Sequence, residues 1–65
     1  MSSPVRFAVV CKLLEQAGYE LARVHGSHHI FAKPGSPIVS IPVHRNQVKP
    51  FYVRQVQRIV DAQNE

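Results

Sequence analysis

The stretch "YELARVHGSHHIFAK", residues 19–33, decides the fold of this chain. Two segments rich in strand-favouring residues flank the pair Gly26-Ser27. Glycine tolerates the positive φ that the first position of a type II′ turn requires, so a two-residue Gly-X loop between such segments indicates a β-hairpin. We therefore expect one strand over residues 19–25 and a second over residues 28–33.

Strand periodicity assigns the side chains of this hairpin to two faces. With a two-residue loop, His25 and His28 are cross-strand neighbours, and His29 points to the other side of the sheet. Neither face is wholly apolar, so the sequence leaves open which one is buried. The face of His28 would also hold Tyr19, Leu21, Arg23, Ile30 and Ala32, and the face of His29 would hold Glu20, Ala22, Val24, Phe31 and Lys33.

A third strand is expected after the turn "PGSP", over residues 38–43, with Val39, Ile41 and Val43 on one face. Pro42 cannot donate a hydrogen bond to a ladder, which favours either an edge position for this strand or a place for Pro42 near the end of the strand. The sequence "HRNQVK", residues 44–49, is expected to be a polar connection.

A helix is predicted on each side of these strands. Apolar residues recur at helical spacing over residues 5–17, with Pro4 suited to the first turn and Gly18 to the stop. A second helix is expected to start at Pro50 and to run through residues 53–60. The apolar positions of the two helices are Phe7, Val10, Leu14, Ala17, Val53, Val56, Ile59 and Val60.

The predicted order is helix, three antiparallel strands, helix, in one domain over residues 1–65. This is an α+β layout in which two helices cover one face of the sheet and the other face stays open. It matches a double-stranded-RNA-binding-like fold, and function has to be argued from the site.

The amino-acid composition indicates what kind of protein this is and what kind of partner it binds. The chain is 45% hydrophobic and 18% charged, which is typical of a folded domain. Its single cysteine, Cys11, and the lack of a run of about 18 apolar residues lead us to expect a cytoplasmic protein that does not bind membranes. The net charge of +4 favours a polyanionic partner, either nucleic acid or an acidic protein.

Three of the four histidines lie within residues 25–29, and the fourth is His44. A metal site would need three or four of them to converge, whereas successive strand residues diverge, so we expect no metal and no cofactor. A tight turn would hold His28 in a fixed direction, which suits proton transfer. The alternative is that these are ordinary polar residues of turns and sheet rims.

Two segments resemble the HicA-type, or YcfA-like, toxins, which are small ribonucleases of bacterial toxin–antitoxin pairs. They are "LLEQAGYELARVHGSHHIF", residues 13–31, and "IPVHRNQVKPFYVRQV", residues 41–56, and the resemblance extends over about residues 8–62. It implies the fold above, cleavage of mRNA and neutralisation by a HicB-type antitoxin. It also implies that the histidine after Gly-Ser, here His28, is catalytic, and it places His44 on the Pro-Val-His position of the family.

The chain departs from the family pattern at two places. Arg45 stands where a glycine often follows Pro-Val-His, and Phe51-Tyr52 replaces the Gly-Thr pair that commonly opens the last helix. These two aromatics are able to stack on bases, but their place at a helix start favours packing instead.

RNA supplies its own nucleophile, the 2′-OH, so cleavage without a metal needs a base, an acid and nearby positive charge. We assign proton transfer to His28, with His25 and His44 as the two candidates for a second group. The expected RNA contacts are Arg23, Lys33, Arg45 and Lys49, each of which has the alternative of being a solvated surface charge. The competing interpretations of the whole chain are a non-catalytic RNA-binding module and a protein-interaction module of the same fold.

Overall fold

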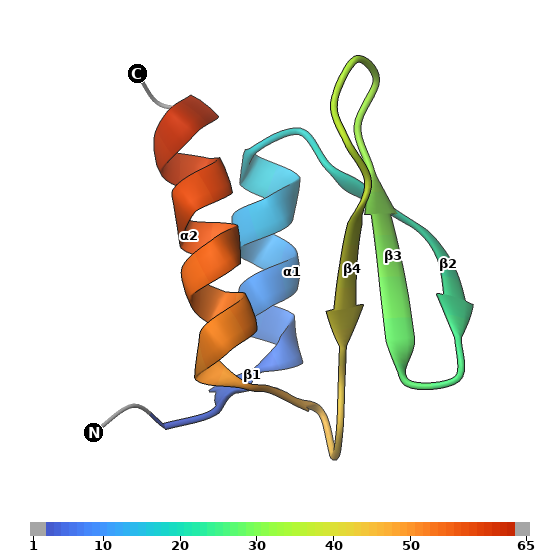
Figure 1. Ribbon diagram of the computed structural model, residues 1–65, viewed down its shortest axis with the longest axis vertical. Coiled ribbons are helices and arrows are strands. Elements are labelled where there is room, and N and C mark those ends of the chain that lie inside the picture. The colour runs from blue at the N-terminus through green and yellow to red at the C-terminus, as the bar shows by residue number, and fades with distance from the viewer. Residues whose placement is uncertain (1–2, 64–65) are drawn as a thin grey trace.

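The computed structural model describes residues 3–63 of the 65-residue chain. In chain order its elements are β1 (Val5–Arg6), α1 (Phe7–Gln16), β2 (Glu20–His25), β3 (His28–Ala32), β4 (Val39–Pro42), β5 (Gln47–Val48) and α2 (Pro50–Gln63). Strands β2, β3 and β4 form an antiparallel sheet in that order, and β1 pairs with β5. Both helices lie on the same side of the sheet, with α1 between α2 and the strands (Figure 1). The predicted α+β, double-stranded-RNA-binding-like fold is confirmed.

The β2–β3 hairpin has the predicted two-residue loop. His25 pairs with His28, and Gly26 has a φ of +57°, which is the positive value that favours glycine. Strand β4 pairs only with β3 among residues 3–63, so Pro42 lies on an edge strand as expected. His28 therefore begins the central strand of the sheet and has neighbours on both sides.

A β-bulge in β2 corrects the predicted division of side chains between the two faces. Arg23 pairs with Ile30 and Leu21 pairs with Phe31, so Ala22 is the extra residue in the ladder. The bulge moves Leu21 to the face of Phe31 and His29, opposite to the prediction. An alternation count cannot detect an inserted residue, because the bulge depends on how two strands fit together.

The first helix begins at Phe7 rather than at Val5, which is a second correction. Val5 and Arg6 form β1 and pair with Val48 and Gln47, and the N–H of Phe7 donates to the carbonyl of Asn46 at 2.8 Å. The spacing of Val5 fits a helix as well as a strand, so local periodicity alone does not reveal this pairing with a distant segment.

The end of α1 is the predicted one. Gly18 has a φ of +93°, its N–H donates to Glu15, and the N–H of Tyr19 donates to Leu14. This pair of bonds is the Schellman arrangement, in which a glycine just past the helix satisfies the last carbonyls.

The connection at residues 44–49 is more ordered than predicted. His44 and Gln47 exchange backbone hydrogen bonds at 3.1 and 2.9 Å around Arg45 and Asn46, whose φ angles are +53° and +62°. Positive φ at both central residues is the signature of a type I′ turn. This turn delivers Gln47 and Val48 to β1.

One hydrophobic core joins the helices to the sheet. Phe31 and Ile41 contribute from the sheet, and both expected helical stripes contribute from α1 and α2, which confirms them. Val39 and Val43 pack against the same core, as predicted for their face of β4. The buried residues are Val10, Leu14, Ala17, Tyr19, Phe31, Ile41, Val48, Val56 and Val60. The buried face of the sheet is therefore that of Phe31 and His29, and the face of His28 is open.

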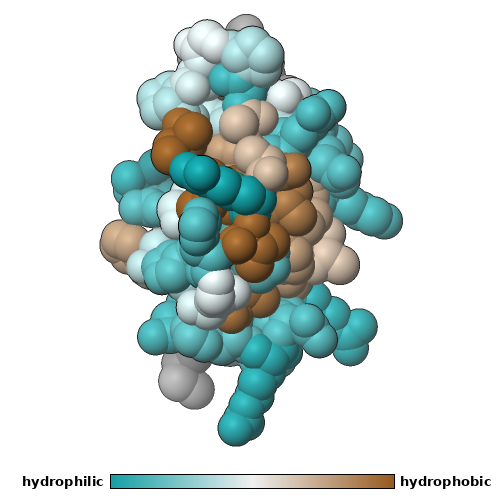
Figure 2. Space-filling model, turned by 90° about the vertical axis from the view of Figure 1, so that its right-hand side faces the viewer, coloured by the Kyte–Doolittle hydropathy of each residue, from teal (hydrophilic) through white to brown (hydrophobic). Residues whose placement is uncertain are grey.

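The helices do not cover β2 on the buried side of the sheet. Leu21 and Val24 lie on that side, yet their side chains are 47% and 49% exposed. Figure 2, which views the molecule from the β2 side, shows apolar side chains reaching the surface among hydrophilic ones. Phe31 of β3 and Ile41 of β4 are buried in the core, so the predicted cover of one face of the sheet stops short of β2.

Candidate functional site

His28 lies on the open face at the start of the central strand. Its cross-strand neighbours are His25 on β2 and Pro42 on β4. The imidazole is exposed, and its Nδ1 lies 3.4 Å from the Oγ of Ser40, at the long end for a hydrogen bond. Because strands flank it on both sides, the backbone fixes the point and direction in which the side chain leaves the sheet, while its exposure leaves the ring free to meet a ligand.

His25 is positioned as a second group for His28. The two residues are directly opposite each other, and paired residues of an antiparallel ladder have Cβ atoms about 5 Å apart on the same face. His25 is exposed, like His28. Two imidazoles on one surface are a suitable pair for giving and taking a proton.

His44 and Arg45 are held at the same end of the molecule as His28. The N–H of Val43 donates to the carbonyl of Ser27 at 2.7 Å, which ties the chain before the type I′ turn to the loop of the hairpin. In Figure 1 this hairpin loop and the connection that follows β4 both lie at the lower end. His44 and Arg45 are exposed there.

The other predicted basic residues lie in different places. Arg23 is exposed and pairs with Ile30, which places it on the open face with His28. Lys49 is exposed between β5 and α2. The structure therefore brings Arg23, Arg45 and Lys49 into the half of the molecule that carries His28.

Lys33 is directed elsewhere. It follows the last residue of β3, about 17 Å along the strand from His28 at 3.3–3.4 Å per residue. Its Nζ donates to the carbonyl of Ala17 at 2.7 Å and to Oε1 of Gln63, and lies 5.9 Å from the centre of the Tyr19 ring. The ammonium group thus connects the ends of α1 and α2 on the helix side of the sheet.

His29 packs on the other side of the sheet. Its ring centre is 4.5 Å from that of Phe7, and its Nδ1 is 3.4 Å from the carbonyl of Ser27. His29 is half-buried, so it contributes to packing under α1. Within residues 3–63 there is no group of three histidine, cysteine or acidic side chains arranged to hold a metal ion.

The two aromatics at the start of α2 behave differently. Tyr52 packs against the core, as expected. Phe51 is 56% exposed and meets Tyr52 edge-on at 5.1 Å, so the expectation that it packs inside is wrong. Its ring is available at the surface.

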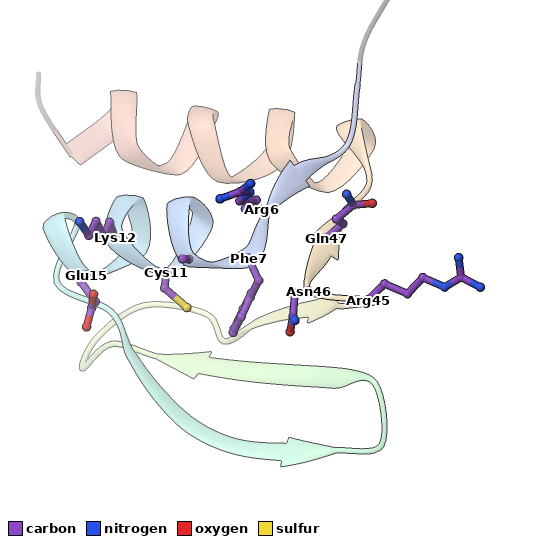
Figure 3. A pocket seen from close by; sticks show the side chains of 9 residues that line it. Arg6, Phe7, Cys11, Lys12, Glu15, Arg45, Asn46 and Gln47 are labelled. Atoms are coloured by element: carbon purple, nitrogen blue, oxygen red, sulfur yellow. The ribbon is translucent and has the colours of Figure 1, made fainter.

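An open pocket of about 670 Å³ lies between α1 and the type I′ turn. Phe7 and Glu15 point from α1 toward the strands, and Asn46 lies at the end formed by the type I′ turn (Figure 3). Three further lining residues, Arg6, Lys12 and Arg45, carry positive charge. Sequence reasoning missed this pocket because it placed the helix start too early and predicted only a polar connection where the type I′ turn lies.

Cys11 also lines this pocket. Burial, together with the nearby carboxylate of Glu15, raises the pKa of its thiol. A raised pKa keeps the sulfur protonated at neutral pH, which makes it a poor nucleophile. The pocket therefore lacks an activated cysteine.

No helix within residues 3–63 is long and apolar enough to span a membrane. The search of curated proteins finds no match to the chain. A family model described as "HicA toxin of bacterial toxin-antitoxin" matches residues 8–62. This match covers nearly the whole chain and includes the hairpin with His28, the type I′ turn and most of α2. The chain therefore belongs to the HicA toxin family of bacterial toxin–antitoxin systems, whose members have an antitoxin partner.

Proposed function

We propose that this toxin is a metal-independent endoribonuclease that cleaves mRNA, that His28 transfers a proton in the reaction, and that a HicB-type antitoxin inhibits it. The observation that carries the proposal is the placement of His28. It is exposed on the open face, directly after the Gly26-Ser27 loop, and the pairing of β3 on both sides fixes its direction.

The chemistry needs few groups, because RNA brings its own nucleophile. A base removes the proton of the 2′-OH, the oxygen attacks the adjacent phosphorus, and an acid protonates the departing 5′-oxygen. An imidazole serves either role at neutral pH, and each role contributes about 10²–10⁴ in rate. His28 is one of the two groups, and His25 is the better placed of the two candidates for the other, because the ladder puts it opposite His28.

Positive charge near the scissile phosphate would come from Arg23, Arg45 and Lys49. All three are exposed, and cations at a phosphate stabilise the charge that develops during cleavage. Lys33 is left out of this set because its ammonium group binds Ala17 and Gln63. Exposed Phe51 is a candidate for stacking on an unpaired base.

The test of the proposal is induced expression of the wild type beside His28→Ala. Growth arrest with fragmented mRNA is expected for the wild type only, and the purified variant should cleave RNA slower by about 10²–10⁴. Because His28 is exposed, alanine should not unfold the chain, and thermal melts at equal protein concentration check this.

The matched control is His29→Phe, which removes the neighbouring imidazole but keeps a ring against Phe7. It should remain toxic. If neither the wild type nor the control arrests growth while both are folded, the ribonuclease proposal fails and the chain acts as an RNA-binding or protein-interaction module.

A further inference from the structure

Strand β2 offers an unpaired edge. It pairs with β3 on one side, and no strand within residues 3–63 pairs with its other side. It is six residues long, contains no proline and is exposed throughout. The opposite edge, β4, is only four residues long and carries Pro42, which lacks an N–H group. An edge strand of this kind is a template for a strand from another chain.

The hairpin geometry identifies the backbone groups at this edge. Residues that flank a two-residue hairpin loop exchange hydrogen bonds with each other, as His25 and His28 do in this register. The next residue, Val24, therefore directs its N–H and C=O away from β3. The bulge at Ala22 interrupts the edge, so regular pairing with another strand would centre on Val24.

An uncovered apolar surface adjoins this edge on the helix side. Leu21 and Val24 are about half exposed there, beside Phe31 and His29, which pack against Phe7. A strand added to β2 would place alternate side chains on this side. Apolar side chains at those positions would cover Leu21 and Val24, which α1 leaves exposed.

The charged residues on the open face of β2 indicate which side chains an added strand should carry on that face. Arg23 lies on the open face with His28 and His25, and Glu20, at the far end of the strand, is the acidic residue of that face of β2. Acidic side chains of an added strand would complement Arg23. A second copy of this chain would instead bring the same net charge of +4 to the edge.

From these observations we infer that the antitoxin adds an extended strand to the outer edge of β2, with apolar residues against Leu21 and Val24 and acidic residues beside Arg23. The identity of the partner rests on the proposed function. This position places the acidic residues next to His25 and therefore beside His28. The added strand would then block access to the proposed catalytic histidine, His28, from the β2 side of the sheet.

The direct test is amide hydrogen exchange, read by NMR, of the full chain alone and in its purified complex with the cognate antitoxin. Protection of the Val24 amide should increase by about tenfold or more on binding, because its free N–H gains a partner. An unchanged Val24 amide in a complex that has formed overturns the inference. Protection of Val24 in the toxin alone, with a doubled molecular mass, would show that a second copy occupies the edge.

Two pairs of variants test the side chains, with affinity for the antitoxin measured by calorimetry. Val24→Asp should weaken binding by about tenfold or more, whereas Val9→Asp, at a residue of equal exposure on α1, should leave it within about twofold. Arg23→Glu should weaken binding by about tenfold, and Arg54→Glu on α2 should not. Equal losses within both pairs would overturn the inference.

The assay separates this inference from the proposed function, because binding is measured without RNA cleavage. A toxin that binds the antitoxin through β2 but cleaves no RNA would refute the ribonuclease proposal alone. If the wild-type toxin cleaves RNA, and the variants Val24→Asp and Arg23→Glu bind the antitoxin as tightly as the wild type does, the strand addition alone is refuted.

Discussion

Arg45 is the residue whose backbone least suits its side chain. Its φ of +53° lies in the left-handed region, which costs a residue with a Cβ about 1–2 kcal/mol. The next residue, Asn46, has a φ of +62°, and asparagine tolerates this region better. The resemblance noted from the sequence puts a glycine at the position of Arg45, and the turn explains why glycine fits there. Retaining an arginine at a strained position is compatible with a role in RNA contact.

The change Arg45→Gly should therefore stabilise the fold. Relief of about 1–2 kcal/mol is offset by the entropy that glycine loses on folding, about 0.5–1 kcal/mol, so the free energy of unfolding should rise by about 0.5–1 kcal/mol. Urea unfolding measures the change. Arg54→Gly is the matched control, because it lies within α2, where glycine should cost about 1 kcal/mol. A loss of stability in both variants would contradict the prediction.

At the scale of elements, the β2–β3 hairpin determines how the site is presented. Gly26 has a φ of +57°, and no heavy atom outside residues 25–27 lies within 4 Å of the place that a Cβ would occupy. Glycine is therefore favoured at position 26 because of the backbone conformation and not because of a lack of space. The two-residue length of this loop sets the register that places His25 opposite His28, and the sequence was sufficient to predict that length.

We predict that Gly26→Ala impairs both stability and RNA cleavage. The strained φ should lower the free energy of unfolding by about 1–2 kcal/mol, and a shifted loop would misdirect His28. Gly35→Ala is the control, because Gly35 also has a positive φ, +78°, with open space around it, but lies in the turn at the other end of β3. Chemical denaturation should show a similar loss of stability for Gly35→Ala. RNA cleavage assays should show that this variant keeps the wild-type cleavage rate. Equal loss of cleavage in the two folded variants would disprove the role of the loop.

Other elements could not be predicted from local sequence. The two-residue strand β1 exists because β5 lies beside it, and β5 is placed there by the type I′ turn. The bulge at Ala22 reflects the fit of β2 to β3. Both features arise from pairing between segments, whereas periodicity describes one segment at a time.

At the scale of the whole molecule, Lys33 joins three elements. Its side chain extends from the end of β3 over Gly18 and reaches the carbonyl of Ala17 after α1 and the side chain of Gln63 at the end of α2. A Cβ at Gly18 would lie 3.1 Å from the Cε of Lys33, so the glycine that ends α1 also leaves room for this lysine. The positive charge of Lys33 therefore serves to join the ends of α1 and α2.

The variant Lys33→Met should therefore lower stability and leave RNA affinity unchanged. Hydrogen bonds from a charged group contribute about 1.5–3 kcal/mol to the free energy of unfolding when they are desolvated. Lys33 is partly exposed, so we expect the variant to lose about 1 kcal/mol. Lys49→Met should show the opposite pattern, weaker RNA binding at equal stability. Urea unfolding and RNA titration of the two variants measure both quantities, and an RNA affinity that falls with Lys33→Met at unchanged stability would restore the lysine as an RNA contact.

Local sequence patterns were sufficient to predict the order of the two helices and the three strands of the main sheet, the two-residue loop, the edge position of β4 and the position of His28 at the start of a strand. These follow from periodicity, glycine and proline, which act over a few residues. The three-dimensional structure was needed to show which face of the sheet is buried, where α1 begins, and that Lys33 binds Ala17 and Gln63. It also left Leu21 and Val24 uncovered. The physical reason is that burial and pairing depend on segments far apart in the chain. A local sequence pattern does not indicate which distant segment will pack against it.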